Sequence, residues 1–147
     1  MNREAFNMIK NWLSVVAWMG LIFLFSTDIF SGANTSSFFG PLLSSLFPIM
    51  TADQIETVHL IVRKLGHWCE YFILATLIAR ALNAQTQRQS RLRRTASAIV
   101  IATLYAASDE WHQAFVPSRS ASAIDVLIDS FGAVSGTIWF ERRRRCR

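Results

Sequence analysis

The segment Ser-Asp-Glu-Trp-His-Gln-Ala-Phe-Val-Pro-Ser-Arg-Ser-Ala-Ser-Ala-Ile-Asp-Val-Leu-Ile-Asp occupies residues 108–129, between two apolar runs that can each cross much of a bilayer. It carries four carboxylates, one histidine, one glutamine and one arginine. A charged side chain at the centre of a membrane helix costs roughly 2.5–3.5 kcal/mol on insertion scales. Seven ionisable or amide side chains in this position therefore require a reason.

The composition favours a single membrane domain over residues 1–147, because 52% of the residues are hydrophobic and only 17% are charged. Outside the segment above, the charges gather in blocks near both termini and around residues 53–70 and 88–94. The net charge of +5 does not indicate nucleic-acid binding, because the basic blocks contain no interleaved aromatics on which bases could stack. The two cysteines, Cys69 and Cys146, are expected to remain unpaired.

The apolar segments predict an all-α bundle of about four transmembrane helices, at residues 9–27, 64–82, 95–114 and 123–140. The first segment could instead be a signal peptide, since Ser31-Gly32-Ala33 resembles a cleavage site, but its tryptophans better suit a packed membrane helix. In the fourth segment, Gly132 and Gly136 form a small-xxx-small surface that could serve an internal contact or a dimer equally well.

Residues 28–60 are expected to form a loop on the outer side of the membrane. Glycine, proline, asparagine and serine residues in its first half break any long helix. Its apolar part, around residues 38–50, is expected to lie on the membrane interface or to fold down as a lid. Thr51 is expected to cap the helix that leads into the second span.

The distribution of basic residues predicts the orientation. Of the 15 Lys and Arg residues, 12 fall in the N-terminal tail, in residues 80–94 and in the C-terminal tail, so the positive-inside rule places both termini in the cytoplasm. Spans two and four then enter from the outside and begin with polar residues, whereas spans one and three end there. Eight of the ten carboxylates consequently fall in the outer half, which predicts one polar cavity on the extracytoplasmic side.

The residues expected in this cavity divide into two groups. Histidines beside carboxylates suit general acid–base chemistry, and the other polar side chains suit the binding of a polar ligand. The catalytic candidates are His67, Glu70, Asp109 and His112. The ligand-binding candidates are Lys64, Glu110, Gln113, Arg119, Asp125 and Asp129.

Several of these candidates also have a structural interpretation. His67 and Glu70, three residues apart on one helical face, could form an ion pair that only holds the bundle together. Glu110 and Asp125 lie nearer the predicted surface, where we favour solvated helix ends. Arg119 is a natural partner for a carboxylate or for an anionic ligand, since its guanidinium forks onto carboxylate or phosphate.

A metal centre is a weaker interpretation of the same residues. Two imidazoles and three carboxylates in the cavity could ligate Zn²⁺ or a pair of metal ions. However, the sequence has no His-Glu-x-x-His motif and no closely spaced cysteines, and a histidine near a carboxylate is common by chance. We therefore predict no metal ligands and assign no cofactor.

Two motifs carry a resemblance to a known family. Lys64-Leu-Gly-His67-Trp-Cys-Glu70-Tyr, with the Glu, Gln, Pro, Arg and Asp spacing of residues 109–132, resembles the VanZ-like family of bacterial integral membrane proteins over roughly residues 12–140. Ser118 stands where the family usually has glycine, and Asp129 where it usually has asparagine. The resemblance implies a four-span protein of the bacterial cytoplasmic (inner) membrane, in a family named for a protein linked to glycopeptide resistance.

The leading functional hypothesis is an outward-facing polar pocket that binds a lipid or glycoconjugate head group and, in an enzymatic version, modifies it. Its partners would be membrane lipids or lipid-linked envelope precursors. A second hypothesis is a non-enzymatic accessory protein, whose polar cavity only holds the helices together. A third is a small proton-coupled transporter, against which the inner halves of the spans carry few polar residues. The sequence leaves open whether any reaction is catalysed.

Overall fold

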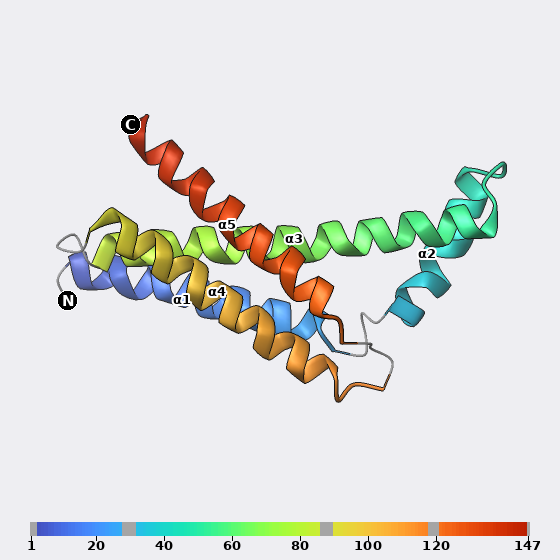
Figure 1. Ribbon diagram of the computed structural model, residues 1–147, viewed down its shortest axis with the longest axis horizontal. Coiled ribbons are helices and arrows are strands. Elements are labelled where there is room, and N and C mark those ends of the chain that lie inside the picture. Colours follow the sequence, from blue (N-terminus) through green and yellow to red (C-terminus); the bar gives the residue numbers. More distant parts are fainter. Residues whose placement is uncertain (1–2, 28–31, 86–89, 118–120, 147) are drawn as a thin grey trace.

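The computed structural model describes residues 3–27, 32–85, 90–117 and 121–146. Within these ranges the regular structure is entirely helical (Figure 1), which confirms the predicted all-α class. The helices are α1 (Arg3–Phe25), α2 (Gly32–Leu46), α3 (Ala52–Gln85), α4 (Arg91–Gln113) and α5 (Ala123–Arg145). Among the described residues two helices, at Ala5–Phe25 and Ala123–Arg145, have the length and apolar composition of a membrane span.

The segment between the first two predicted spans differs from the expected loop. Residues 32–46 form α2, although Gly40 and Pro41 lie inside it. Intrinsic propensity is a weak guide where a helix packs against a neighbour, and α2 packs against α3. The prediction that glycine and proline exclude a long helix here is therefore wrong.

The third helix begins 12 residues before the predicted second span, at Ala52 instead of Lys64, and contains 34 residues. It is about 51 Å long at 1.5 Å per residue, whereas a bilayer's hydrocarbon core is about 30 Å thick. Thr51 caps its start as predicted: the Gln54 amide donates to Thr51 Oγ1 at 3.3 Å, and the Thr51 amide donates to Gln54 Oε1 at 2.9 Å. The first turns of α3 thus form a firmly capped projection, on which α2 lies (Figure 1).

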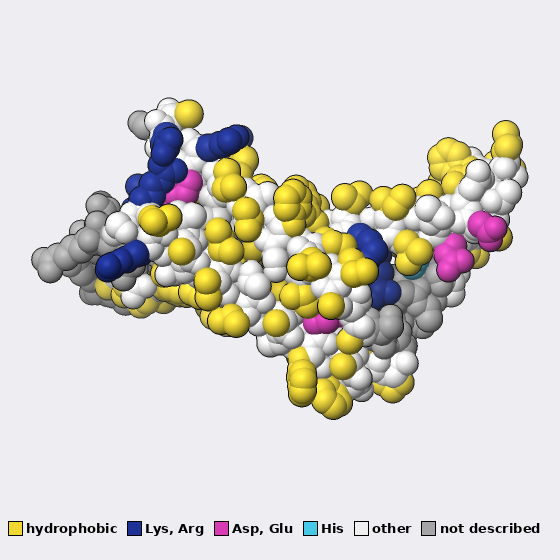
Figure 2. All heavy atoms as spheres, viewed as in Figure 1, with side chains coloured by type: hydrophobic (Ala, Val, Ile, Leu, Met, Phe, Trp, Pro, Cys, Tyr) yellow, Lys and Arg dark blue, Asp and Glu magenta, His cyan; other side chains and the backbone are white. Residues whose placement is uncertain are grey.

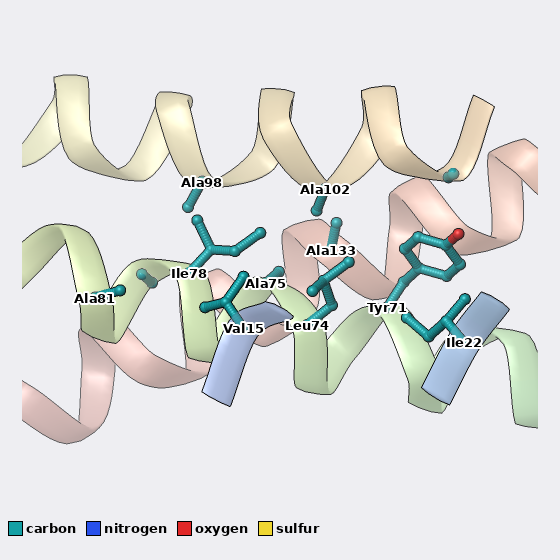
Figure 3. Close-up of a cluster of buried hydrophobic side chains, with 12 residues drawn as sticks. Val15, Ile22, Tyr71, Leu74, Ala75, Ile78, Ala81, Ala98, Ala102 and Ala133 are labelled. Carbon is teal, nitrogen blue, oxygen red and sulfur yellow. The ribbon is translucent and has the colours of Figure 1, made fainter. Parts of the chain in front are cut away.

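Helix α3 is the centre of the fold, because each of the other four helices packs against it. Alanines of α4 and α5 bring the neighbouring backbones close to larger α3 side chains such as Tyr71, Leu74 and Ile78 (Figure 3). The fully or nearly fully buried apolar residues are Val15, Ile22, Tyr71, Leu74, Ala75, Ile78, Ala79, Ala81, Ala98, Ala102, Ala106 and Ala133.

Helix α5 crosses α3 at two glycines (Figure 1). A Cβ added to Gly132 would lie 2.5 Å from the Trp68 carbonyl oxygen, and a Cβ on Gly136 would collide with the carbonyl oxygen of Phe72. The Thr76 hydroxyl lies 3.2 Å from the Gly136 carbonyl oxygen and can donate to it across the same contact. The Gly132–Gly136 surface is therefore an internal helix–helix contact, one of the two alternatives that the sequence left open.

Four helix termini lie at one end of the molecule: the start of α1, the end of α3, the start of α4 and the end of α5 (Figure 1). There the Glu141 carboxylate, only 8% exposed, lies 2.7 Å from Nε of Arg91, which joins α5 to α4. The indole of Trp12 donates to the Gln85 side chain at 3.2 Å and joins α1 to α3. The polar residues considered below lie in the middle turns of α3, near the end of α4 and near the start of α5.

We predict that Gly136→Ala destabilises the protein in detergent by about 1–3 kcal/mol or more, because its Cβ meets backbone, which cannot rotate away. The matched control is Gly20→Ala in α1, where no described neighbouring atom lies within 4 Å of the added Cβ. There the better helix propensity of alanine should leave stability unchanged or raise it by up to about 1 kcal/mol. The thermal unfolding temperature should fall for Gly136→Ala but not for Gly20→Ala, and an equal response of the two variants would contradict the crossing.

Candidate functional site

Of the nine predicted site residues that the structure describes, six are buried, from α3, α4 and α5: His67, Asp109, Glu110, Gln113, Asp125 and Asp129. The two most deeply buried are Gln113 and Asp129, each 1% exposed. Buried charges and amides are rare unless they are paired or hydrogen-bonded, so the contacts of each one decide what it does.

His67 faces Asp129 across the α3–α5 crossing. Its Nδ1 lies 3.4 Å from Oδ1 of Asp129, which is longer than the usual 2.7–3.2 Å of an N–H···O hydrogen bond. The contact lies about one helical turn from Gly132, so the glycines bring these two side chains together. Asp129, which the sequence analysis did not pair with His67, is therefore its carboxylate partner.

Asp109 and Gln113 form a polar pair on α4. The Gln113 amide donates from Nε2 to Oδ2 of Asp109 at 3.0 Å, as expected for residues one helical turn apart. Oδ1 of Asp109 and Oε1 of Gln113 are buried and accept no hydrogen bond from any residue that the structure describes. Two buried acceptor oxygens on neighbouring turns of α4 thus have no described protein donor.

Glu110 and Asp125 are buried, in contrast to the solvated helix ends favoured from the sequence. Oε1 of Glu110 accepts a hydrogen bond from the backbone amide of Ser122, the N-cap residue of α5, whose own side chain makes no capping hydrogen bond. In a capping box, a glutamate in the first turn of a helix accepts a hydrogen bond from the backbone amide of that helix's N-cap residue. Glu110 makes the same contact with the N-cap of α5, although it belongs to α4. Asp125 Oδ1 lies 2.7 Å from Lys64 Nζ, an ion pair between α5 and α3.

A pocket of about 280 Å³ lies beside the buried polar residues, between α1, α2, α3 and α4. It brings together four predicted residues, His67, Glu70, Asp109 and Gln113. Its other lining residues are Ile22, Phe25, Ser26, Thr35, Phe39, His59, Val62, Arg63 and Gly66. The lining combines apolar side chains, mostly from α1 and α2, with cationic and anionic side chains from α3 and α4.

The remaining predicted residues lie elsewhere. Lys64 and Asp125 line a smaller neighbouring pocket of about 180 Å³, which shares His67 with the first. His112 does not line either of these pockets; its ring packs against Phe23 of α1 with centroids 4.7 Å apart. Arg119 lies outside the described residues. No group of three or more His, Cys, Asp or Glu side chains within the described ranges is arranged to hold a metal ion.

Thr35, His59 and Arg63 are lining residues that the sequence analysis missed. The signal was present: residues 59, 63 and 67 are spaced by four and lie on one helical face. The prediction does not use it, because it assigns residues 28–60 to an outer loop and takes the polar set from the span that begins at Lys64. The continuous α3 places His59 and Arg63 in line with His67.

The fold and the buried residues place the chain in the class of all-helical proteins with two candidate transmembrane helices and a buried polar cluster. The chain matches the family VanZ/LLP1 over residues 11–143 and belongs to that family. The match covers the region over which the sequence resembles the VanZ-like family, so that resemblance is confirmed. No curated protein and no solved structure was found to match the chain.

The capping role of Glu110 predicts a graded response to substitution. Glu110→Ala should lower the unfolding free energy in detergent by about 0.5–2 kcal/mol, the usual cost of losing an N-terminal cap. Glu110→Gln keeps an acceptor oxygen for the Ser122 amide and should restore part of the loss. Glu56→Ala, at an exposed position on α3, is the control and should have no effect. A Glu110→Ala protein as stable as the wild type would exclude the capping role.

Proposed function

We propose that α1, α3, α4 and α5 all cross the bacterial cytoplasmic membrane, with both termini in the cytoplasm and the pocket open to the outer face. Support comes from the 12 basic residues of the tails and the connector and from the helix ends that meet at one end of the bundle (Figure 1). Large apolar side chains such as Leu13, Leu104 and Leu127 are exposed on the outside of the bundle (Figure 2). Exposed apolar side chains over much of the surface are suited to lipid.

We further propose that the pocket binds the head group of an envelope lipid or lipid-linked glycoconjugate. The observation that carries this is the pair of unpartnered acceptor oxygens on Asp109 and Gln113, two residues that line a pocket together with apolar side chains of α1 and α2. Hydroxyl or ammonium donors of a head group would satisfy the oxygens, which are costly to bury alone. Ile22, Phe25 and Phe39 would contact the adjoining hydrocarbon. An amphiphile matches both kinds of lining side chain.

The pocket also supplies a candidate for proton transfer, should the bound head group be modified. His67 lines the pocket and contacts Asp129, an arrangement that orients an imidazole for general acid–base chemistry. His112 is less well placed for this role because it packs against Phe23. Glu70 and Asp109 remain candidates for orienting the substrate beside His67.

A second candidate function is that of a non-enzymatic accessory protein. The Lys64–Asp125 ion pair and the Glu110–Ser122 hydrogen bond favour it for those residues, because both contacts join helices to one another. They do not account for Asp109 and Gln113, because Oδ1 of Asp109 and Oε1 of Gln113 have no described hydrogen-bond partner. A proton-coupled transporter has less support. Beyond Tyr71 the described apolar core is built from residues such as Leu74, Ala75 and Ile78, whose side chains have no titratable group that could relay a proton.

Native mass spectrometry of the purified protein with its co-purifying lipids tests the proposal. Wild type should retain a specific lipid or lipid-linked sugar, and Asp109→Asn should lose it because one acceptor oxygen becomes a donor. Asp53→Asn, an exposed position in the first turn of α3, makes the same chemical change away from this pocket and should retain the lipid. Arg119→Ala provides a second variant for the predicted anion partner. Equal, non-specific lipid in all proteins would favour the accessory role.

A further inference from the structure

The geometry points to a phosphate-binding position at the end of the pocket nearest α2, formed by Arg63 and His59. This inference rests on the proposed function, because it names the chemical class of the ligand as a phosphorylated amphiphile. Neither residue belongs to the polar set that the sequence indicated. Both lie on the part of α3 that precedes the predicted span.

Arg63 lies where the cavities meet. It lines the main pocket, the smaller pocket that holds Lys64 and Asp125, and a third pocket of about 540 Å³ between α2 and α3. Within the described residues its guanidinium makes no ion pair, whereas Lys64, the next residue, is paired with Asp125. A guanidinium that faces a pocket without a described carboxylate partner is suited to an anionic ligand.

His59 is held beside Arg63 by α2. Its Nε2 lies 3.2 Å from the Thr35 hydroxyl, and its ring lies 6.3 Å from that of Phe39, centroid to centroid. When Nε2 accepts from Thr35, Nδ1 carries the proton and can donate to a ligand oxygen. One turn of α3 separates His59 from Arg63, so their side chains lie on the same helical face.

The charged residues that line the pocket are arranged along α3, with basic residues toward one end and acidic residues toward the other. This arrangement favours a ligand whose phosphate group is attached to further hydrogen-bond donors. The basic end contains His59 and Arg63, and the acidic end contains Glu70 and Asp109. Arg63 and Glu70 are seven residues apart, about 10 Å along the helix axis. A phosphate at the basic end would place attached hydroxyl or ammonium groups toward the acidic end, and the apolar side chains of α1 and α2 would contact the acyl chains. A simple anion would interact only with His59 and Arg63 at the basic end and would donate no hydrogen bond to Glu70 or Asp109 at the acidic end.

Binding of three probes to the purified full chain in detergent micelles tests this position. The probes are a short-chain phosphatidylglycerol, a diacylglycerol with the same chains but no phosphate, and inorganic phosphate. Wild type should bind the phospholipid more tightly than the diacylglycerol. Arg63→Gln should weaken phospholipid binding about tenfold, the effect of losing one charge-assisted contact of about 1.4 kcal/mol, and leave diacylglycerol binding unchanged. Arg63→Lys should retain part of the affinity.

The matched control is Arg80→Gln, the same substitution at an exposed position near the other end of α3, which should leave all three affinities unchanged. If Arg63→Gln binds phospholipid as wild type does, the phosphate position is overturned while lipid binding by the pocket stands. If only inorganic phosphate binds, and does so through Arg63, the ligand is a soluble phosphate and the lipid proposal fails instead. If no probe binds above the micelle background, both are overturned.

Discussion

The rest of the structure depends on the close approach of α5 to α3 at Gly132 and Gly136. Any side chain at either position would meet backbone atoms of α3, so the crossing exists only because both residues are glycine. It brings Asp129 within 3.4 Å of His67 and Asp125 within 2.7 Å of Lys64. In lipid, where apolar surfaces gain little by meeting one another, such close backbone packing is a principal force that holds helices together.

The buried polar residues divide into those that join helices and those that face the pocket. Glu110 caps α5 and Asp125 pairs with Lys64, and these contacts satisfy groups that would otherwise be costly to bury. Asp109 and Gln113 satisfy each other only in part, and both residues line the pocket. A protein that needed polar groups only for assembly would have no use for the second kind, which is why we favour a ligand.

The sequence predicted helices in the regions of α1, α3, α4 and α5, because long apolar runs and a capping threonine are local signals. Six of its predicted site residues are buried, but it did not predict their pairing, since the His67–Asp129 and Glu110–Ser122 contacts depend on how α3, α4 and α5 pack. It missed α2, where packing against α3 outweighs Gly40 and Pro41. The same loop assignment left His59 and Arg63 outside the predicted site, although Thr51 was correctly predicted to cap a helix.

The membrane topology is the most direct test of the account, because the pocket can meet a lipid head group outside the cell only if α3 and α4 both span. In a protein without Cys69 and Cys146, single cysteines would replace Ser44 in α2 or Ser90 at the start of α4, and intact cells would be treated with a membrane-impermeant thiol reagent. We expect Ser44→Cys to be labelled in intact cells and Ser90→Cys only after permeabilisation. Labelling of both from the outside would show that α3 does not cross the membrane and would contradict the account.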